Sequence, residues 1–368
     1  MTVIRPFLRD GVDVYVRGDD EVHFVFLATR KRITAKIKPF LIQSLAWLDG
    51  KADVDSLAER MAWLHGADAR DQFIGLLAYL EHQGIVIEPD WLAHTGLDES
   101  TLVIQQRQLS FFLDVLGSPE EASQAQRKIS EARLVCFGVG AVGSWLLRLL
   151  LGLGFKHFVL IDHDRTETAD VTRHAFFEES DVSNAASKAT DTAKRIREQF
   201  GGVEVVAKNE PLTTDTALET LIDPSTDLVI NAADEPYIGY TSVLLSRFCV
   251  PRRIPLLVAG GFNAHLGSLG ELIVPGVTPC ADCYADYFQE ALKDWQPVEH
   301  PVADRQNAAG GLCSLSVFAA GAAAMKILRY FTGEDAVEGG RGEMLFHNYQ
   351  LDAFKVERRP DCRVCSTL

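Results

Sequence analysis

The pattern of apolar and polar positions changes near residue 130. Beyond that point, short apolar runs alternate with longer helical patterns. The predicted strands cover residues 133–137, 158–161, 203–207, 227–231 and 254–259, and the predicted helices cover residues 144–153, 187–199, 214–221 and 241–250. Strands that alternate with helices indicate a mostly parallel sheet with helices on both faces. We therefore predict an α/β domain over residues 131–368.

Residues 1–92 carry a different pattern, which predicts a small α+β domain. Two alternating stretches, residues 12–16 and 22–27, flank a Gly-Asp-Asp turn and predict a β-hairpin. Helical patterns follow at residues 37–48, 54–63 and 69–83, and a short strand at residues 84–87 closes the domain. This order is winged-helix-like. A DNA-binding role is disfavoured because the last helix has one Arg and no Lys to reach phosphates and bases.

Residues 93–130 are predicted to connect the two domains. This connector contains Arg107, and its Ser118-Pro119 pair followed by two acids marks a helix start. Two later stretches depart from the α/β pattern. Residues 266–274 alternate like an antiparallel strand pair, and residues 284–306 are aromatic, acidic and broken by prolines, as expected of a surface segment or lid.

Composition narrows the function. The chain has 368 residues, 47% of them apolar, and a formal net charge of -15. Nucleic-acid affinity rests on Lys and Arg, so this charge argues against nucleic acid as a partner. No signal-peptide pattern and no run of about 18 apolar residues is present, so we expect a cytoplasmic protein that does not bind membranes.

The sequence GVGAVG at residues 138–143 follows the first strand of the α/β domain and opens a helix. Gly138 permits a tight turn, Gly140 lets the backbone approach a phosphate, and Gly143 lets helix and strand pack closely. The next strand ends in Asp162 and Asp164, about 20 residues on, where an acid can meet ribose hydroxyls. The motif predicts a Rossmann-like nucleotide site, which a dinucleotide-dependent oxidoreductase would also carry.

Four of the seven cysteines form two CxxC pairs, Cys280 with Cys283 and Cys362 with Cys365. Two such pairs complete a closed tetrahedral site, which predicts a structural Zn²⁺. A redox dithiol would not explain the second pair. The other cysteines, Cys136, Cys249 and Cys313, lie in apolar patterns and are expected in the core, with a nucleophilic Cys313 as the minor alternative. Beyond the strand end, Arg173 and Lys188 could neutralise a polyphosphate or could simply be surface charges.

These motifs together resemble the ubiquitin-activating-enzyme-like adenylating family, which includes enzymes of the molybdopterin and thiamine pathways. The resemblance runs from about Gln105 to the C-terminus and rests on GVGAVG, the DHD strand end, ADVTRHAFF, Lys188, NAADEP and the two CxxC pairs. The N-terminal domain resembles PqqD-like leader-recognition domains over about 80 residues. Both together point to the peptide-modifying branch of the family, of the pantocin A and microcin C types.

The resemblance implies ATP and Mg²⁺ as cofactors. It places Asp162 at the ribose, Arg173 and Lys188 at the phosphates, and Asp234 at Mg²⁺. It also implies a homodimer in which Arg107 reaches the ATP of the other subunit.

Several positions depart from the family pattern: Ile104 replaces an Arg, Asp170 an Asn, and His174 a Gln. Ala141 stands where Gly is common, and two extra residues precede Lys188. Asp170 should weaken ATP binding unless it takes part in metal binding, so we include Asp170 with Asp164 in the expected cofactor site.

The implied reaction is activation of a peptide carboxylate by adenylation or phosphorylation. In the pantocin-like case the carboxylate is a Glu side chain of a precursor peptide. The leader of that peptide is expected to add as a strand to the hairpin edge near residues 22–27. Candidate bases are His174, His265, Tyr284 and Asn307. Three alternatives stay open: C-terminal adenylation of a microcin C-type peptide, adenylation of a sulfur carrier, and a non-catalytic leader-binding scaffold, for which Asp170 is the best argument. Nucleotide turnover separates the scaffold from the enzymes.

Overall fold

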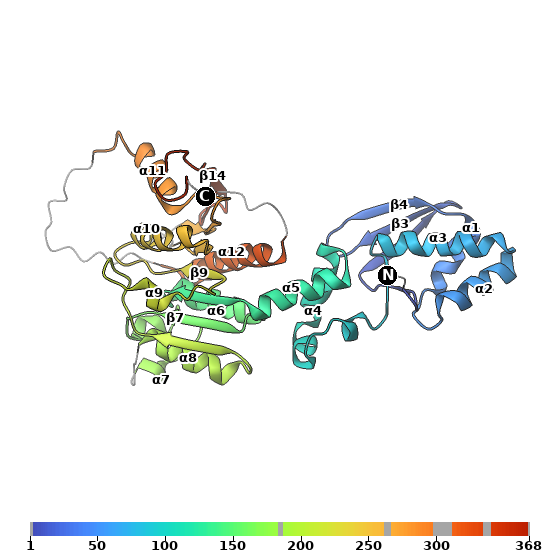
Figure 1. Ribbon diagram of the computed structural model, residues 1–368, viewed down its shortest axis with the longest axis horizontal. Helices are drawn as coiled ribbons and strands as arrows, with labels where there is room; N and C mark the ends of the chain where they lie inside the picture. The colour runs from blue at the N-terminus through green and yellow to red at the C-terminus, as the bar shows by residue number, and fades with distance from the viewer. Residues whose placement is uncertain (1–2, 183–186, 261–265, 297–310, 334–339, 367–368) are drawn as a thin grey trace. The chain divides into compact units, whose positions relative to one another are not determined.

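The computed structural model describes residues 3–182, 187–260, 266–296, 311–333 and 340–366. Its contacts divide the chain into two compact units, Met1–Arg127 and Lys128–Leu368 (Figure 1). No helix among the described residues is long and apolar enough to cross a membrane.

The second unit is built on a six-stranded sheet with the order β12-β10-β9-β6-β7-β8. The strands are β6 (Arg133–Phe137), β7 (His157–Ile161), β8 (Glu204–Lys208), β9 (Leu228–Asn231), β10 (Leu256–Val258) and β12 (Glu271–Ile273). Neighbouring strands are parallel except β12, which runs antiparallel to β10. The predicted mostly parallel α/β fold is therefore confirmed.

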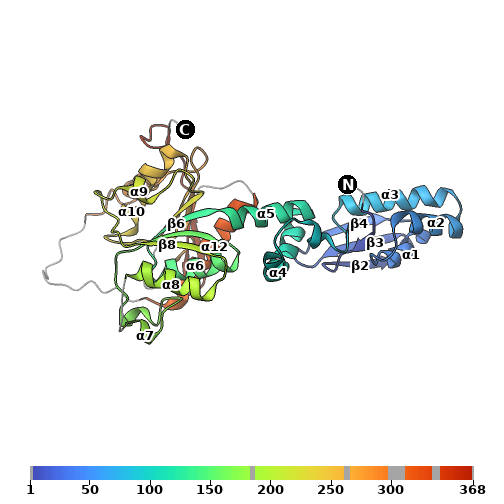
Figure 2. The same cartoon turned by 60° about the horizontal axis from the view of Figure 1, so that its bottom comes forward.

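Helices cover both faces of this sheet, with α8 and α10 on opposite sides (Figure 2). They are α6 (Ala141–Gly152), α7 (Glu179–Val182), α8 (Lys188–Gln199), α9 (Leu218–Leu221), α10 (Ile238–Cys249), α11 (Ala281–Ala291) and α12 (Cys313–Thr332). Helix α8 begins where the sequence predicts, because the Ser187 hydroxyl accepts the Thr190 N–H at 3.2 Å. On the α10 face, Val229 and Leu256 pack with Leu245 in one buried core.

A second, antiparallel sheet of the same unit has the order β11-β13-β14. Its strands are β11 (Leu266–Ser268), β13 (Arg341–Leu345) and β14 (Leu351–Phe354). Residues 266–274 therefore contain two antiparallel strands, as predicted, but the expectation that these strands pair with each other is wrong. Strands β11 and β12 turn apart at Gly270, at φ +74°, and each pairs in a different sheet.

The first unit contains a three-stranded antiparallel sheet with the order β2-β3-β4. Its elements are β1 (Phe7–Leu8), β2 (Val12–Arg17), β3 (Glu21–Phe26), β4 (Arg32–Lys36), α1 (Pro39–Ser44), α2 (Val54–His65), α3 (Asp68–His82) and β5 (Val86–Ile87). Strands β1 and β5 pair separately. Alternate residues of β3, namely Val22, Phe24 and Phe26, are buried with α2 and α3 in one apolar core.

The third strand of this sheet corrects one expectation. Strand β4 pairs with β3 on the side opposite β2, so β3 is the central strand. Residues 22–27 therefore offer no free edge, and the predicted site of leader addition near them is wrong. The sequence missed β4 because its short polar and basic pattern has no strong apolar alternation.

The predicted connector is largely helical. Helix α4 (Glu99–Leu116) was not predicted, whereas α5 (Pro119–Glu131) begins at the predicted Ser118, whose hydroxyl accepts the Glu121 N–H at 3.2 Å. Within the first unit, Arg9 forms a buried ion pair with Asp114 of α4 and donates to the Gly84 carbonyl at 3.1 Å. These contacts tie α4 to the strands of the same unit.

Candidate functional site

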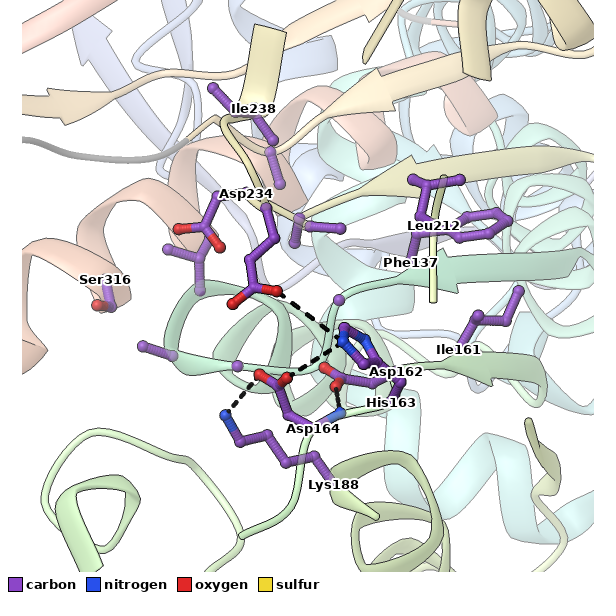
Figure 3. A pocket seen from close by; sticks show the side chains of 18 of the residues that line it. Phe137, Ile161, Asp162, His163, Asp164, Lys188, Leu212, Asp234, Ile238 and Ser316 are labelled. Carbon is purple, nitrogen blue, oxygen red and sulfur yellow. Dashed lines mark hydrogen bonds and ion pairs between the residues drawn. The ribbon is translucent and has the colours of Figure 1, made fainter. Parts of the chain in front are cut away.

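In the second unit the strand order reverses between β6 and β9, which is where open α/β sheets place their ligands. A cavity of about 1120 Å³ lies there, at the carboxyl ends of β6, β7, β9 and β10 (Figure 3). The structure brings seven sequence-predicted residues to its lining: Gly138, Gly140, Asp162, Asp164, Arg173, Lys188 and Asp234.

The glycine turn forms one wall of the cavity. Gly138 has φ +82°, and a Cβ there would lie 2.5 Å from the Ala232 carbonyl carbon on β9's extension. A Cβ on Gly143 would lie 2.1 Å from the Gly138 oxygen, so only glycine allows this helix to start so close to the strand. Among the described residues, and apart from the adjoining backbone, no heavy atom lies within 4 Å of the position that a Cβ would take at Gly140. The backbone at Gly140 is therefore open to a ligand, and Gly143 acts behind the turn.

Lys188 is buried at the cavity wall with two carboxylate partners. Its ammonium lies 3.1 Å from Asp164 Oδ2 and 3.5 Å from Asp170 Oδ2. Burial alone would lower the pKa of Lys188, but Asp170 and Asp164 outweigh that effect and raise it. Lys188 is thus a fixed cation rather than a surface charge.

Asp170 lies beneath the cavity, fully buried, and does not line it. Its Oδ1 accepts from Arg173 Nη2 at 2.8 Å and Nε at 3.1 Å, and its Oδ2 accepts the Glu167 N–H at 3.0 Å. Burial acts to raise the pKa of Asp170, but the Glu167 N–H, Lys188 and Arg173 together lower it. The extra negative charge expected from the sequence is therefore matched by two cations that it holds in place.

The two acids at the end of β7 differ in exposure. Both oxygens of Asp162 accept backbone N–H groups, from Val139 at 2.8 Å and Asp164 at 2.9 Å. Burial is the main reason that the pKa of Asp162 is raised. The Asp164 side chain is 40% exposed at the cavity, so it is the more accessible of the two acids.

The opposite wall comes from β9, β10 and the start of α12. Asp234 follows β9 and is exposed at the cavity, as Figure 3 shows. The sequence missed Ser316 and Tyr240, which also line the cavity. Cys313, expected in the core, is only half-buried and lines the cavity, whereas Cys136 and Cys249 are buried as predicted.

Arg107 is exposed on α4 of the first unit. It shares one face of that helix with Val103, Ile104 and Phe111, which are 72%, 72% and 47% exposed. Of the candidate bases, His174 and Tyr284 are buried and line no part of the cavity. His265 and Asn307 lie outside the described residues.

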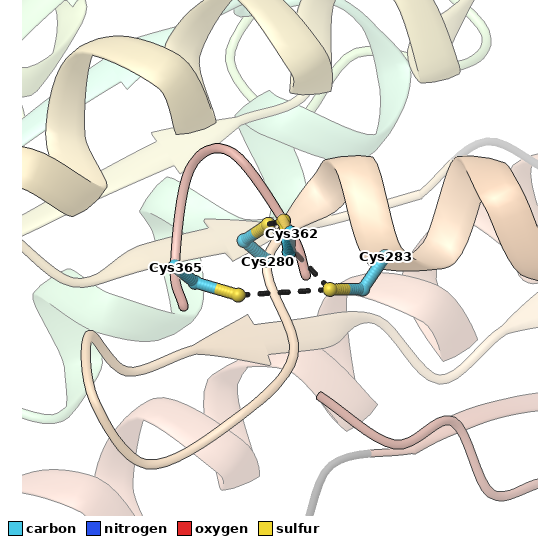
Figure 4. Close-up of side chains that lie close together, drawn as sticks. All are labelled: Cys280, Cys283, Cys362 and Cys365. Carbon is cyan, nitrogen blue, oxygen red and sulfur yellow. Dashed lines mark hydrogen bonds between the residues drawn. The ribbon is translucent and has the colours of Figure 1, made fainter. Parts of the chain in front are cut away.

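The two CxxC pairs meet in a buried cluster at the start of α11 and the C-terminal segment (Figure 4). The Sγ–Sγ distances are 3.9 Å for Cys280–Cys283, 3.5 Å for Cys280–Cys362 and 3.6 Å for Cys283–Cys365. Four sulfurs at 2.3 Å from a central Zn²⁺ in a tetrahedron would be about 3.8 Å apart. The cluster therefore fits a closed Zn²⁺ site.

The pKa values within this cluster are shifted in opposite directions. Burial raises the pKa of Cys280 and raises that of Cys283 to about 11, whereas at Cys362 burial is outweighed by hydrogen bonds from the Val364 and Cys365 N–H groups and from the neighbouring thiols, which lower the pKa of Cys362. A bound cation would favour the thiolate form of the cysteines that ligate it. Cys362 lies 82 residues after Cys280 in the sequence. A metal bound by both CxxC pairs would therefore close a large loop.

Taken together, the fold and the cavity define a doubly wound α/β protein with a nucleotide-type glycine turn and a four-cysteine centre. The ThiF family model matches residues 106–364 of this chain. The chain therefore belongs to the ThiF family, as the sequence motifs indicated.

Curated relatives are similar over part of the chain. The sulfur carrier protein ThiS adenylyltransferase of Bacillus subtilis is 30% identical over 163 residues, which cover 44% of this chain and 46% of the relative. The adenylyltransferase and sulfurtransferase MOCS3 of Aedes aegypti is 25% identical over 246 residues, covering 66% and 52%. The chain thus spans about half the length of these relatives.

Solved structures are similar over nearly the whole chain. E. coli MccB with ATP superposes with a TM-score of 0.71 at 16% identity, covering 98% of this chain and 99% of MccB. PaaA superposes with a TM-score of 0.74 at 17% identity, covering 95% and 100%. At this level of identity, these neighbours establish a shared fold.

Proposed function

We propose that this chain uses Mg·ATP to activate a carboxylate of a precursor peptide by adenylation. The observation that carries the proposal is the single cavity in which the glycine turn, Lys188, Arg173 and Asp234 converge. Membership of the ThiF family supports it. Further support comes from the neighbour MccB, which has been crystallised with ATP and with MccA.

The proposed reaction begins with attack of a peptide carboxylate oxygen on the α-phosphorus of ATP. The bond between that phosphorus and the bridging oxygen breaks, and pyrophosphate leaves. Lys188, Arg173 and the N–H groups at the start of α6 would stabilise the charge that builds on the phosphate oxygens. Asp234 would hold Mg²⁺, which supplies charge neutralisation between the phosphates. Asp164, with its exposed carboxylate, would meet the ribose more readily than Asp162.

The peptide would bind through its leader at the sheet edge of the first unit. Among the described residues, β2 and β4 each have an unpaired edge. The β4 edge is the stronger candidate because it is basic. No Asp or Glu occurs between Glu21 and Asp49, and this stretch carries the exposed residues Arg30, Lys31, Arg32, Lys36 and Lys38. An extended acidic segment would gain main-chain hydrogen bonds and charge complementarity there.

We also propose a homodimer formed through the α4 face defined by Val103, Ile104, Arg107 and Phe111. Exposed apolar side chains around an Arg suit contact with a second copy more than contact with water. Arg107 would then reach the ATP of the partner, where a permanently charged, bidentate guanidinium suits phosphate. Substitution of Ile104 by Glu should shift the protein to a monomer in analytical ultracentrifugation and reduce turnover.

The test of the main proposal is turnover with α-³²P-labelled and γ-³²P-labelled ATP and a candidate precursor peptide. Peptide-dependent ATP–pyrophosphate exchange, with the α-label retained on AMP or peptide, is expected. Release of phosphate without exchange would mean phosphorylation of the carboxylate instead. Absence of nucleotide turnover with any peptide would overturn the proposal and favour a leader-binding scaffold.

A second candidate is adenylation of a sulfur carrier, which the 30% identity to the B. subtilis ThiS adenylyltransferase favours. The same exchange assay with a carrier protein ending in Gly-Gly distinguishes the two. Removal of the basic residues of β4 should leave carrier turnover unchanged but weaken turnover of a leader-bearing peptide.

A further inference from the structure

Two side chains hold the glycine turn from behind. The Val139 N–H donates to Asp162 Oδ2 at 2.8 Å. The Val139 carbonyl accepts from His174 Nε2 at 2.7 Å. Two successive peptide groups of the turn are therefore each fixed at one end by a side chain.

The bond to His174 sets the direction of a neighbouring donor. A trans peptide group is planar, so its C=O and its N–H point in opposite directions. The Val139 carbonyl and the Gly140 N–H belong to the same peptide group, and the carbonyl faces His174. The Gly140 N–H consequently points away from the imidazole. Gly140 lines the cavity, and among the described residues nothing crowds the position that its Cβ would take, so an anion in the cavity can approach this N–H.

The surroundings of His174 fix both its orientation and its proton. The ring is 5% exposed and lies flat on Phe177, with centroids 3.6 Å apart and an interplanar angle of 4°. Nδ1 accepts the Phe176 N–H at 3.2 Å, so Nε2 carries the hydrogen of the neutral ring. Burial is the main cause that lowers the pKa of His174 to about 4, and Lys188 and Arg173 add to it, against Asp170 and the Val139 bond.

The same ring joins the other two phosphate-binding elements. His174 follows Arg173 directly in the chain. Its Nε2 lies 3.5 Å from the Thr192 hydroxyl on α8, the helix that begins with Lys188. One neutral imidazole thus touches the glycine turn, the Arg173 segment and the Lys188 helix.

We propose that His174 is a positioning residue for the binding of the ATP polyphosphate. In this role His174 directs the Gly140 N–H into the cavity and holds the segments that carry Arg173 and Lys188 next to the glycine turn. This inference rests on the proposed function, because it requires that ATP occupies the cavity. The inference also argues against His174 as a general base, since the His174 ring does not line the cavity.

The test compares His174→Leu and His174→Gln by calorimetric titration with Mg·ATP and, separately, with adenosine. Loss of the directed donor in His174→Leu should weaken Mg·ATP binding about tenfold. Adenosine, which has no phosphates, should bind as it does to the wild type. Gln carries both a donor and an acceptor, so His174→Gln should stay within about threefold of the wild type. His157→Leu is the matched control, because that histidine starts β7 and contacts Glu204.

Several outcomes would contradict the inference. Equal Mg·ATP affinity in His174→Leu and the wild type would overturn it, and so would parallel loss of ATP and adenosine binding, which indicates general damage. If His174→Leu does not fold, Phe177→Leu keeps the imidazole but removes its stacking partner, and it should weaken Mg·ATP about threefold with adenosine unchanged; unchanged ATP affinity would count against the inference. A wild type that binds no Mg·ATP would remove the proposed function itself.

Discussion

The cavity of the second unit and the β4 edge of the first unit both present cations, but in opposite ways. Lys188 is 6% exposed and is held between two carboxylates, whereas Arg32 and Lys36 on β4 are exposed. Buried, paired charges keep their geometry before a ligand arrives, while exposed ones are flexible and screened by salt. The cavity is therefore suited to selecting one ligand, and the β4 edge to attracting many similar ones.

The largest effect should come from the four-cysteine centre, which belongs to the cavity's unit alone. Cys362→Ser removes one of the four cysteines that would hold the proposed Zn²⁺, and binding of a structural Zn²⁺ contributes about 10 kcal/mol or more to folding. The second unit should lose its metal and unfold at a much lower temperature, while the first unit keeps its own transition. Metal analysis and calorimetry measure both. Cys249→Ser, a buried cysteine outside the cluster, should keep full zinc; a zinc-replete Cys362→Ser protein would refute the metal assignment.

Asp234→Ala should separate catalysis from peptide binding. Loss of the proposed Mg²⁺ ligand should lower turnover by about a hundredfold or more, because charge on the phosphates is no longer neutralised. Peptide affinity, which we attribute to the first unit, should not change. Glu235→Ala is the control, since Glu235 is also exposed and lies 3.9 Å from His163. Equal loss of turnover and peptide binding would show that the two regions are not independent.

Asp170→Ala tests whether the buried charges of the cavity depend on each other. It leaves Lys188 with one carboxylate and Arg173 with none of its present side-chain acceptors. Breaking such a buried pair costs about 3–5 kcal/mol of unfolding free energy, which urea unfolding measures. Asp170→Asn, which keeps the shape, should lie between this variant and the wild type. A loss below about 1 kcal/mol would mean that the pairing is not a stabilising feature.

The stability of the second unit should depend on pH through His174. Its pKa is about 4 in the folded chain against an ordinary value of 6.5, so the unfolded chain takes up the proton first as pH falls. The contribution is fully present above pH 6.5 and is lost as pH falls from 6.5 towards 4, by up to about 3 kcal/mol. His174→Gln should remove this part of the pH dependence in urea unfolding at pH 7 and pH 5. Identical pH dependence in both proteins would contradict it.

The smallest effect should be at the exposed edge. Arg32→Glu with Lys36→Glu should weaken binding of a fluorescently labelled precursor peptide about tenfold at low salt and less at high salt. ATP affinity should stay the same. Arg17→Glu on β2 is the matched control at the other edge. A larger loss of peptide affinity in the β2 variant would indicate that the leader binds at the β2 edge instead.

Local signals in the sequence predicted local structure well. The Gly138 turn and the Ser118 cap of α5 were predictable because a few adjacent residues determine each of them. The CxxC pairs could be joined across the sequence because zinc chemistry requires four ligands. Motifs and their spacing therefore predicted most of the α/β domain.

Features that depend on distant partners were not predictable. Strand β4 is defined by pairing with β3 rather than by its own pattern, and β11 and β12 pair in different sheets although they are adjacent in sequence. The charge of Asp170 suggested weaker ATP binding until the structure placed Lys188 and Arg173 beside it. No signal in the sequence indicated that His174 faces the back of the glycine turn.

The four-cysteine centre also constrains the order in which parts of the second unit can fold during synthesis. Cys280 and Cys362 are 82 residues apart, so the first CxxC pair is synthesised well before the second. During that interval the α11 thiols have no partners, although they belong to the same buried core as β9 and β10. The face of the sheet that carries α10 can therefore be completed only after residue 365 has left the ribosome. A Zn²⁺ ion bound by all four cysteines could therefore enter only at this last stage of synthesis.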